Sequence, residues 1–333
     1  MSDQITFVRD DSPGIRREGR ARFRYVDTRG REVSDTVRKR IEALAIPPAW
    51  EHVWICPDPQ GHIQATGRDA RGRKQYRYHS AFRRRRERAK FRGLVPFGEG
   101  LGVLRKRVDG DLRSTNLSRS RVLAAVVALL DQTYIRVGNE GYARDNKTFG
   151  LTTLRCRHVD VRGDRLHLRF NGKGGKVFDL TCCDPRLARV VRRCQDLPGQ
   201  LLFQYVDDDG KPSSISSGDL NDYLRETTGL EDATAKTFRT WGASLLAAEL
   251  FAELDPPPPS SAAELGRIVN ATLAPVAQTL GNTVAVCRAS YVHPKVLDTF
   301  EQGTLGPAWR EGPSRARQGL SAEERRLRGV LRG

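Results

Sequence analysis

A phenol and several cations that lie far apart in the sequence are the groups of this chain best suited to chemistry on a phosphate. Tyr291 stands in the segment Arg-Ala-Ser-Tyr-Val-His-Pro, which ends at Pro294. A tyrosine hydroxyl can act as a nucleophile and form a covalent intermediate. Most tyrosines, however, are core residues whose hydroxyl is hydrogen-bonded. The hypothesis of a catalytic Tyr291 therefore depends on the charged groups that the rest of the chain brings to it.

Arg136 is the first of these cations, and the sequence predicts it at the end of a buried helix. Residues 122–130 are apolar on nearly all sides. Ser118 or Ser120 can cap the start of this helix, and Gly138 ends it. A helix end is a rigid mount for an arginine that clamps a phosphate. The alternative is an arginine that only favours the helix dipole.

Arg239 is the second cation, on a predicted helix that begins near Lys236. Phe238, Trp241 and Leu245 lie three and four residues apart and form the buried stripe of this helix. Arg239 falls beside the stripe, at the edge of the core. An arginine in that position requires an anion, and no acidic residue at helical spacing supplies one.

Lys173 is predicted at the tip of a hairpin. The segments 158–161, 166–170 and 177–180 alternate apolar and polar residues between glycine-containing turns, which indicates a three-stranded meander. A lysine at the second turn suits a proton donor that approaches a bound substrate, and the alternative is an ordinary exposed turn lysine. The glycine-rich segment 172–176 does not match the Walker phosphate-binding loop.

Asn282 precedes Tyr291 by nine residues and is the remaining polar candidate. A continuous helix turns by about 100° per residue and would put the two residues on opposite faces. If both serve one site, the backbone must therefore bend between them. The helix expected over residues 262–280 is itself predicted to bend at Pro275.

The overall charge indicates a polyanionic partner. The 333 residues include 57 Lys and Arg against 40 Asp and Glu, with a formal net charge of +17 and a pI near 10.1. This balance is typical of proteins that bind nucleic acid. A solvated basic surface or a ribosome-associated protein is also compatible with charge alone, so the motifs must decide.

The first ninety residues predict a small antiparallel sheet with one or two helices. The segments 23–26, 53–56 and 62–66 alternate and are separated by turns. A helix is expected over residues 34–44, with Ser34 as its cap.

Aromatic and basic residues are interleaved in the next segment, where Gln75, Tyr76 and Tyr78 stand among arginines. Such side chains can follow phosphates while the rings and amides touch bases or sugars. An equally weighted alternative is a strand whose tyrosines pack inward. The arginine run from Arg83 is expected to form a cationic helix that contacts phosphates and links two lobes.

Cysteine usage and hydropathy predict a soluble protein of the cytoplasm. The six cysteines contain no Cys-x-x-Cys pair and are expected to be reduced, mostly buried thiols. Residues 1–20 lack an apolar signal segment, and the longest apolar run, 122–130, is about half of what a membrane span requires. The histidines and cysteines show no metal-ligand cluster.

These observations predict an α+β protein with two domains. Residues 1–90 are expected to form a small N-terminal antiparallel β-sheet domain. Residues 91–333 are expected to form a larger, mainly α-helical catalytic domain that contains the three-stranded β meander.

Several motifs, in order along the chain, resemble those of type IB DNA topoisomerases, in the compact poxvirus-like branch that bacteria also carry. The resemblance extends over nearly the whole chain as far as Pro294. The matching segments are Tyr134-Ile135-Arg136-Val137-Gly138-Asn139, Gly150-Leu151-Thr152-Thr153-Leu154, Gly172-Lys173, Lys236-Thr237-Phe238-Arg239-Thr240-Trp241 and Ser290-Tyr291-Val292-His293-Pro294.

The resemblance implies a catalytic set that consists of Tyr291, Arg136, Lys173, Arg239 and Asn282. Asn282 stands where the family commonly has a histidine, so it can donate a hydrogen bond to a phosphate but carries no charge. The implied reaction is attack by Tyr291 on a backbone phosphorus, which gives a 3′-phosphotyrosyl link and a free 5′-hydroxyl. Lys173 would protonate the leaving oxygen, with Arg136 assisting. The broken strand swivels and is religated, without ATP, metal or cofactor.

The resemblance also implies the contacts with double-stranded DNA. Gln75, Tyr76 and Tyr78 would contact it from the N-terminal lobe, and Tyr142 lies on a segment that would enter a groove. A monomer is expected to close as a clamp around the duplex, with binding that weakens as salt rises. The expected location is the bacterial cytoplasm, on the nucleoid.

Two other functions fit part of this pattern. A tyrosine recombinase or integrase shares the arginines, the lysine and the tyrosine, but it usually has a histidine three residues before its second arginine, where this chain has Lys236. A catalytically silent DNA-binding protein would bind DNA without forming a covalent adduct. Every required group except the histidine is present, which argues against a silent site.

Overall fold

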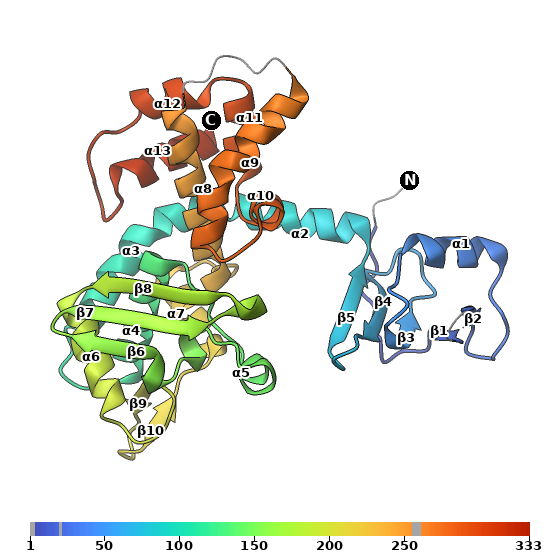
Figure 1. The fold of residues 1–333 in the computed structure, drawn as a ribbon, viewed down its shortest axis with the longest axis horizontal. Helices are drawn as coiled ribbons and strands as arrows, with labels where there is room; N and C mark the ends of the chain where they lie inside the picture. Colours follow the sequence, from blue (N-terminus) through green and yellow to red (C-terminus); the bar gives the residue numbers. More distant parts are fainter. Residues whose placement is uncertain (1–3, 20–21, 255–260) are drawn as a thin grey trace. The chain divides into compact units, whose positions relative to one another are not determined.

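The structure is a computed structural model that describes residues 4–19, 22–254 and 261–333 (Figure 1). The described residues divide into two compact units, Met1–Ala89 and Lys90–Gly333. The boundary falls inside helix α2 (Ser80–Arg92). Each unit has a hydrophobic core of its own.

An antiparallel sheet of strand order β2-β1-β3-β4-β5 forms the body of unit 1 in the described residues. Its strands are β1 (Ile15–Glu18), β2 (Arg24–Val26), β3 (Glu51–Ile55), β4 (Ile63–Arg68) and β5 (Lys74–Tyr78). Helix α1 (Asp35–Ala43) adds the fully buried Ile41 to the core. Ser34 stands at its N-cap position as predicted, although its side chain makes no capping hydrogen bond.

Unit 2 is mainly helical. Its helices are α3 (Leu94–Leu112), α4 (Arg119–Thr133), α5 (Glu140–Asn146), α6 (Pro185–Gln195), α7 (Ser217–Thr228), α8 (Ala235–Glu253), α9 (Ala262–Thr279), α10 (Val284–Ser290), α11 (Pro294–Glu301), α12 (Leu305–Glu311) and α13 (Ala322–Arg332). Helix α4 is apolar nearly all round and contacts α3, α6, α7 and α8, so it forms the centre of this core.

The predicted meander is confirmed in the described residues of unit 2. Antiparallel strands β6 (Val159–Arg162), β7 (Arg165–Asn171) and β8 (Val177–Cys183) form a sheet in sequence order, and α6 contacts it (Figure 1). The short strands β9 (Gln204–Val206) and β10 (Pro212–Ser214) pair separately. The 3₁₀ turns are η1 (Leu151–Thr153), η2 (Cys156–His158) and η3 (Lys173–Gly175). The α+β class predicted from the sequence is therefore confirmed.

The buried helix α4 ends earlier than the sequence pattern predicts. The pattern extends to Gly138, whereas the helix ends at Thr133 and Tyr134 caps it in a left-handed conformation with φ 54°. Beyond this cap the backbone bonds to another segment, since the Leu151 N–H donates to the Arg136 carbonyl oxygen at 2.9 Å. That bond replaces a further helical turn, so Arg136 lies in a non-helical segment and not at a helix end.

The predicted bend before Tyr291 is confirmed. Helix α9 ends at Thr279, and Gly281 turns the chain with φ 61°. Thr283 then caps α10 by accepting a hydrogen bond from a backbone N–H. Asn282 therefore lies in the turn between two helices, and Tyr291 lies at the far end of the second one.

Helix α13 is attached to the core by a buried ion-pair network. Glu324 is 5% exposed and accepts hydrogen bonds from Arg105 at 2.7 and 2.8 Å and from the indole N–H of Trp241 at 3.2 Å. Arg105 also donates to Asp131 at 2.7 Å. Because breaking a buried pair leaves an uncompensated charge, this network fixes α13 against α3 and α8, and it also joins α3 to α4.

The six cysteines are free, and most of them are buried, as predicted. In the described ranges, no helix combines the length and the apolar character that crossing a membrane requires.

Helices α3 and α8 approach each other closely at Gly98. A Cβ atom there would lie 2.3 Å from the ring of Trp241, which is 1% exposed. On the same helix, a Cβ atom at Gly110 would have no neighbour within 4 Å. Gly98 is therefore required by the close approach of the two helices, and Gly110 serves as a control position on the same helix.

Gly98→Ala is expected to lower the free energy of unfolding of unit 2 by about 1–3 kcal/mol, because the added methyl group must displace a buried indole. Gly110→Ala should leave this free energy unchanged or raise it by up to about 1 kcal/mol, since alanine favours the helix. Urea unfolding followed by circular dichroism and tryptophan fluorescence measures both. Equal effects of the two substitutions would contradict the close approach of α3 and α8.

Candidate active site

Side chains from widely separated segments of unit 2 meet at a pocket of about 300 Å³. Its lining includes Tyr291, Arg136, Arg239 and Lys173, all predicted from the sequence, and also Lys236. Asn282, the fifth predicted residue, lies beside this pocket but does not line it. In the described residues, no three His, Cys, Asp or Glu side chains gather as metal ligands would.

Tyr291 is fixed mainly through its backbone. Its carbonyl oxygen lies 3.3 Å from the hydroxyl of Ser244, a fully buried residue of α8. The same hydroxyl oxygen accepts a hydrogen bond from the His293 N–H at 2.9 Å. Lys90 donates to the carbonyl oxygen of Ser290 at 2.7 Å. The residues on both sides of the tyrosine are thus attached to the core, which leaves the phenol directed at the pocket.

Arg239 is held by backbone carbonyl groups at the ends of two helices. It is 3% exposed and donates to the carbonyl oxygen of Leu280, the C-cap of α9, at 2.7 Å. It also donates to the carbonyl oxygen of Tyr134, the C-cap of α4. Helix C-termini carry partial negative charge and stabilise a cation. Carbonyl dipoles take the place of the anion predicted from the sequence, so the guanidinium keeps its full charge.

Arg136 shares one of these carbonyl groups. It donates to the Leu280 carbonyl oxygen at 3.4 Å and to Oδ1 of Asn282. The Nδ2 atom of Asn282 is buried and has no hydrogen-bond partner in the described residues. Lys176 donates to the Asn282 carbonyl oxygen at 2.8 Å. The asparagine therefore orients Arg136 and retains an amide donor that is not used.

Two lysines complete the pocket. Lys173 is exposed, at the tip of the β7–β8 hairpin, as predicted. Lys236 is exposed in the first turn of α8 and was not predicted as a site residue. Its position three residues before Arg239 was a usable signal, because side chains at that spacing share a helix face.

The cations change the acidity of the phenol. Burial would raise the pKa of Tyr291, but the charges of Arg239, Arg136 and Lys236 outweigh burial and bring the pKa below its ordinary value. The guanidinium carbon of Arg239 lies 5.0 Å from the centre of the tyrosine ring. Burial and the neighbouring Arg136 lower the pKa of Arg239 to about 10, so Arg239 remains charged near neutral pH.

The residues predicted to contact DNA do not line this pocket. Tyr76 and Tyr78 stack with ring centroids 5.7 Å apart on edge strand β5 and are 40% and 43% exposed, so the alternative of inward packing is wrong. Gln75 alternates to the opposite face and donates to Asp69 at 3.0 Å. Tyr142 belongs to α5, and its side chain lies outside the described residues.

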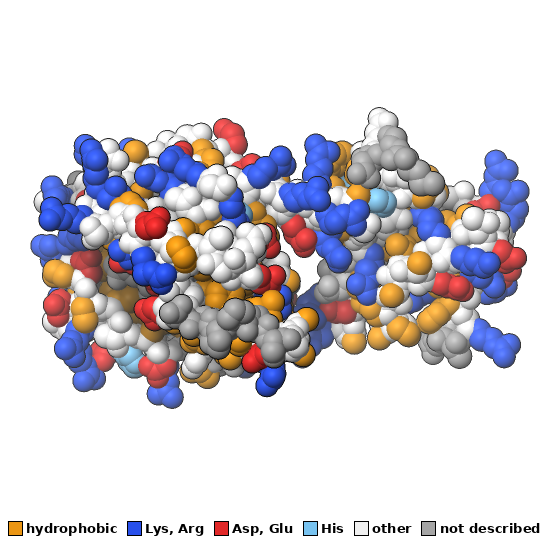
Figure 2. Space-filling view, turned by 90° about the horizontal axis from the view of Figure 1, so that it is seen from above, with side chains coloured by type: hydrophobic (Ala, Val, Ile, Leu, Met, Phe, Trp, Pro, Cys, Tyr) orange, Lys and Arg blue, Asp and Glu red, His pale blue; other side chains and the backbone are white. Residues whose placement is uncertain are grey.

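The pocket can support displacement at phosphorus. A phenol with a lowered pKa supplies the nucleophile, fixed guanidinium groups can stabilise charge on phosphate oxygens, and an exposed lysine can supply a proton. Figure 2 shows Lys and Arg side chains over much of the face in view, with acidic side chains among them. Positive charge is thus also present outside the pocket.

Comparison with known proteins gives consistent matches to one group. The family described as "Eukaryotic DNA topoisomerase I, catalytic core" matches residues 79–305, and "Bacterial DNA topoisomerase IB, N-terminal domain" matches residues 22–69. The chain is 34% identical over 284 residues to DNA topoisomerase 1B of Acanthamoeba polyphaga mimivirus, with 84% of each protein covered. It is 22% identical over 238 residues to DNA topoisomerase 1B of Vaccinia virus (strain Copenhagen), covering 70% of this chain and 71% of the viral protein.

An ultraviolet difference titration of the protein against its Tyr291→Phe variant should show one phenol that ionises below the ordinary pKa of about 10. Lys236→Gln should raise that pKa, because one of the stabilising positive charges is removed. Lys211→Gln, at an exposed lysine of the β9–β10 turn, is the matched control and should leave it unchanged. Ionisation of Tyr291 at or above the ordinary pKa would show that burial outweighs the cations.

Proposed function

The chain belongs to the type IB DNA topoisomerases, which are isomerases that act on DNA, and on this premise we propose that Tyr291 is the nucleophile. Its phenolic oxygen attacks a backbone phosphorus of one strand of a duplex. The phenol loses its proton to solvent as a bond forms between its oxygen and phosphorus. The bond to the 5′-oxygen breaks, and a 3′-phosphotyrosyl link remains. The main support is the contact of the phenol ring with the guanidinium of Arg239, 5.0 Å away.

Arg239 and Arg136 stabilise the transition state. Attack at phosphorus increases negative charge on the nonbridging oxygens, and positive donors fixed in advance stabilise this charge without rearranging. Both guanidinium groups are already oriented by the Leu280 carbonyl oxygen. Loss of one such donor typically costs about a hundredfold to a thousandfold in rate. Asn282 orients Arg136 and provides a further hydrogen-bond donor to the phosphate once its side chain moves.

Lys173 protonates the leaving 5′-oxygen. Its exposed position at a hairpin tip on the pocket supports this role, since the ammonium group can reach a bound strand. The 5′-hydroxyl later attacks the phosphorus and returns its proton to Lys173. The bond between phosphorus and tyrosine breaks, and the released phenolate takes up a proton from solvent. Because the covalent link conserves the phosphodiester, the broken strand can swivel and close without ATP.

Both units bind the duplex, and the protein acts as a monomeric clamp. The exposed aromatic pair Tyr76 and Tyr78 supports a contact from unit 1, since rings and amides can touch bases and sugars. Helix α5, which carries Tyr142, enters a groove. The bacterial N-terminal family match supports a bacterial cytoplasm as the location, with the protein on the nucleoid.

Tyr291→Phe should lower relaxation of supercoiled plasmid by at least about ten-thousandfold, because the covalent route is lost. Binding of a short duplex should change little, since the ring and the cations remain. Gel assays of plasmid topology and of denaturant-stable DNA adducts measure these effects. A variant that still relaxes plasmid would refute the role of Tyr291.

Lys173→Ala should slow cleavage of an ordinary strand by about a hundredfold to ten-thousandfold. With sulfur in place of the bridging 5′-oxygen, the rate should recover, because a thiolate leaves without protonation. Lys176→Ala, on the same hairpin, is the matched control. It should change the cleavage rates of the oxygen-containing and the sulfur-containing strand by the same factor. Absence of rescue for Lys173→Ala would assign this lysine a role other than proton transfer.

A further inference from the structure

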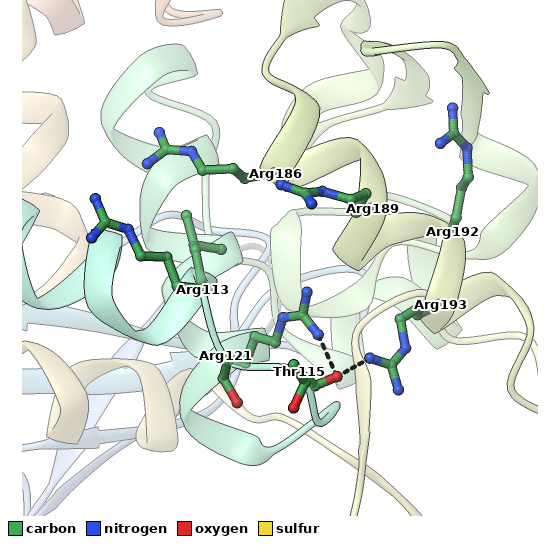
Figure 3. Close-up of a pocket in the computed structure, with 9 residues that line it drawn as sticks. Arg113, Thr115, Arg121, Arg186, Arg189, Arg192 and Arg193 are labelled. Atoms are coloured by element: carbon green, nitrogen blue, oxygen red, sulfur yellow. Dashed lines mark hydrogen bonds between the residues drawn. The ribbon is translucent and has the colours of Figure 1, made fainter.

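A second pocket, of about 530 Å³, lies in unit 2 among residues that the tyrosine pocket does not use. It is formed by the end of α3, the loop that leads to α4, and one face of α6 (Figure 3). Its volume is within the range of small-molecule sites. The arginines that line it are Arg113, Arg121, Arg186, Arg189, Arg192 and Arg193.

The charge of this pocket is not balanced by its own walls. No acidic residue lines it, and of its six arginines only Arg186 forms ion pairs with described residues, with Asp109 at 2.6 Å and with Asp184 at 3.0 Å. Arg186, Arg189 and Arg193 lie three and four residues apart on α6 and so share one face. Several guanidinium groups are therefore concentrated in one hollow without carboxylate partners.

Arg121 is the most buried of these arginines. It is 7% exposed, and its Nε atom is buried without a hydrogen-bond partner in the described residues. Its other contacts are with backbone carbonyl groups, including that of Thr115 at 3.0 Å. Arg193 donates to the same Thr115 carbonyl oxygen, so one neutral acceptor serves two cations (Figure 3). As at Arg239, the carbonyl groups hold these guanidinium groups without neutralising them, so their charge remains available to an anion.

We propose that this pocket binds a linear oligophosphate, either inorganic or as the phosphate chain of a nucleotide. Guanidinium groups bind phosphate oxygens through paired, charge-assisted hydrogen bonds, and several of them can surround a compact group with several negative charges. The hollow fits such a group better than a duplex, whose phosphates each carry a single charge and are spread along the helix axis. The site is independent of the strand-cleavage chemistry.

Tripolyphosphate is the probe that tests the proposal, titrated into the full-length protein by isothermal calorimetry. Hydrogen–deuterium exchange locates binding and should show protection of residues 113–118 and of α6. Arg189→Gln combined with Arg193→Gln should weaken binding at least about tenfold, because charge-assisted contacts are lost at the pocket rim. This double variant should still relax plasmid at the normal rate. Arg165→Gln, an exposed arginine on β7, is the matched control and should bind as the unaltered protein does.

Separate titrations with a nucleoside triphosphate and with orthophosphate show whether the bound oligophosphate is inorganic or part of a nucleotide. Tighter binding of the nucleotide indicates a nucleotide site, and equal or weaker binding indicates an inorganic oligophosphate. Absence of tripolyphosphate binding, or equal binding by the double variant, overturns the proposal. Protection of α6 by a short duplex but not by tripolyphosphate also overturns it and assigns the pocket to DNA.

Discussion

Two guanidinium groups that should repel each other share one carbonyl oxygen, and the active site depends on this arrangement. Arg136 and Arg239 both donate to the carbonyl of Leu280, at the C-terminal end of α9. The carbonyl at the end of α4 holds Arg239 from another side. A carboxylate would hold these cations more strongly, but it would cancel the charge that a phosphate must meet. Carbonyl dipoles position the arginines and leave that charge available.

The need for these carbonyl groups explains where helices α4 and α9 end. Helix α4 must end at Thr133 so that Tyr134 can offer its carbonyl to Arg239. Helix α9 must end before Gly281 so that Leu280 can do the same for both arginines. The two helix ends are therefore parts of the site, and the residues that form them are as important to its geometry as the charged groups.

Much of this was predictable from local sequence, and the exceptions have physical causes. The meander, the buried stripe of α8 and the turn before Tyr291 follow from periodicity and turn residues, which are local signals. The end of α4 was predicted wrongly because the competing hydrogen bonds come from the segment at Leu151, which is distant in sequence. The exposure of Tyr76 and Tyr78 was undecided because alternation alone does not say which face of a strand is covered.

The network around Glu324 was also beyond local analysis, since its partners Arg105, Asp131 and Trp241 come from three other helices. It has a consequence for synthesis of the protein. During synthesis on the ribosome, Arg105 and the indole of Trp241 on α8 emerge well before residue 324. Until then both lack their hydrogen-bond partner, the carboxylate of Glu324. The helix that presents Arg239 therefore makes its hydrogen bond to Glu324 only after its contacts with α3, α4 and α9 are possible, and a chain that stops before residue 324 lacks that bond.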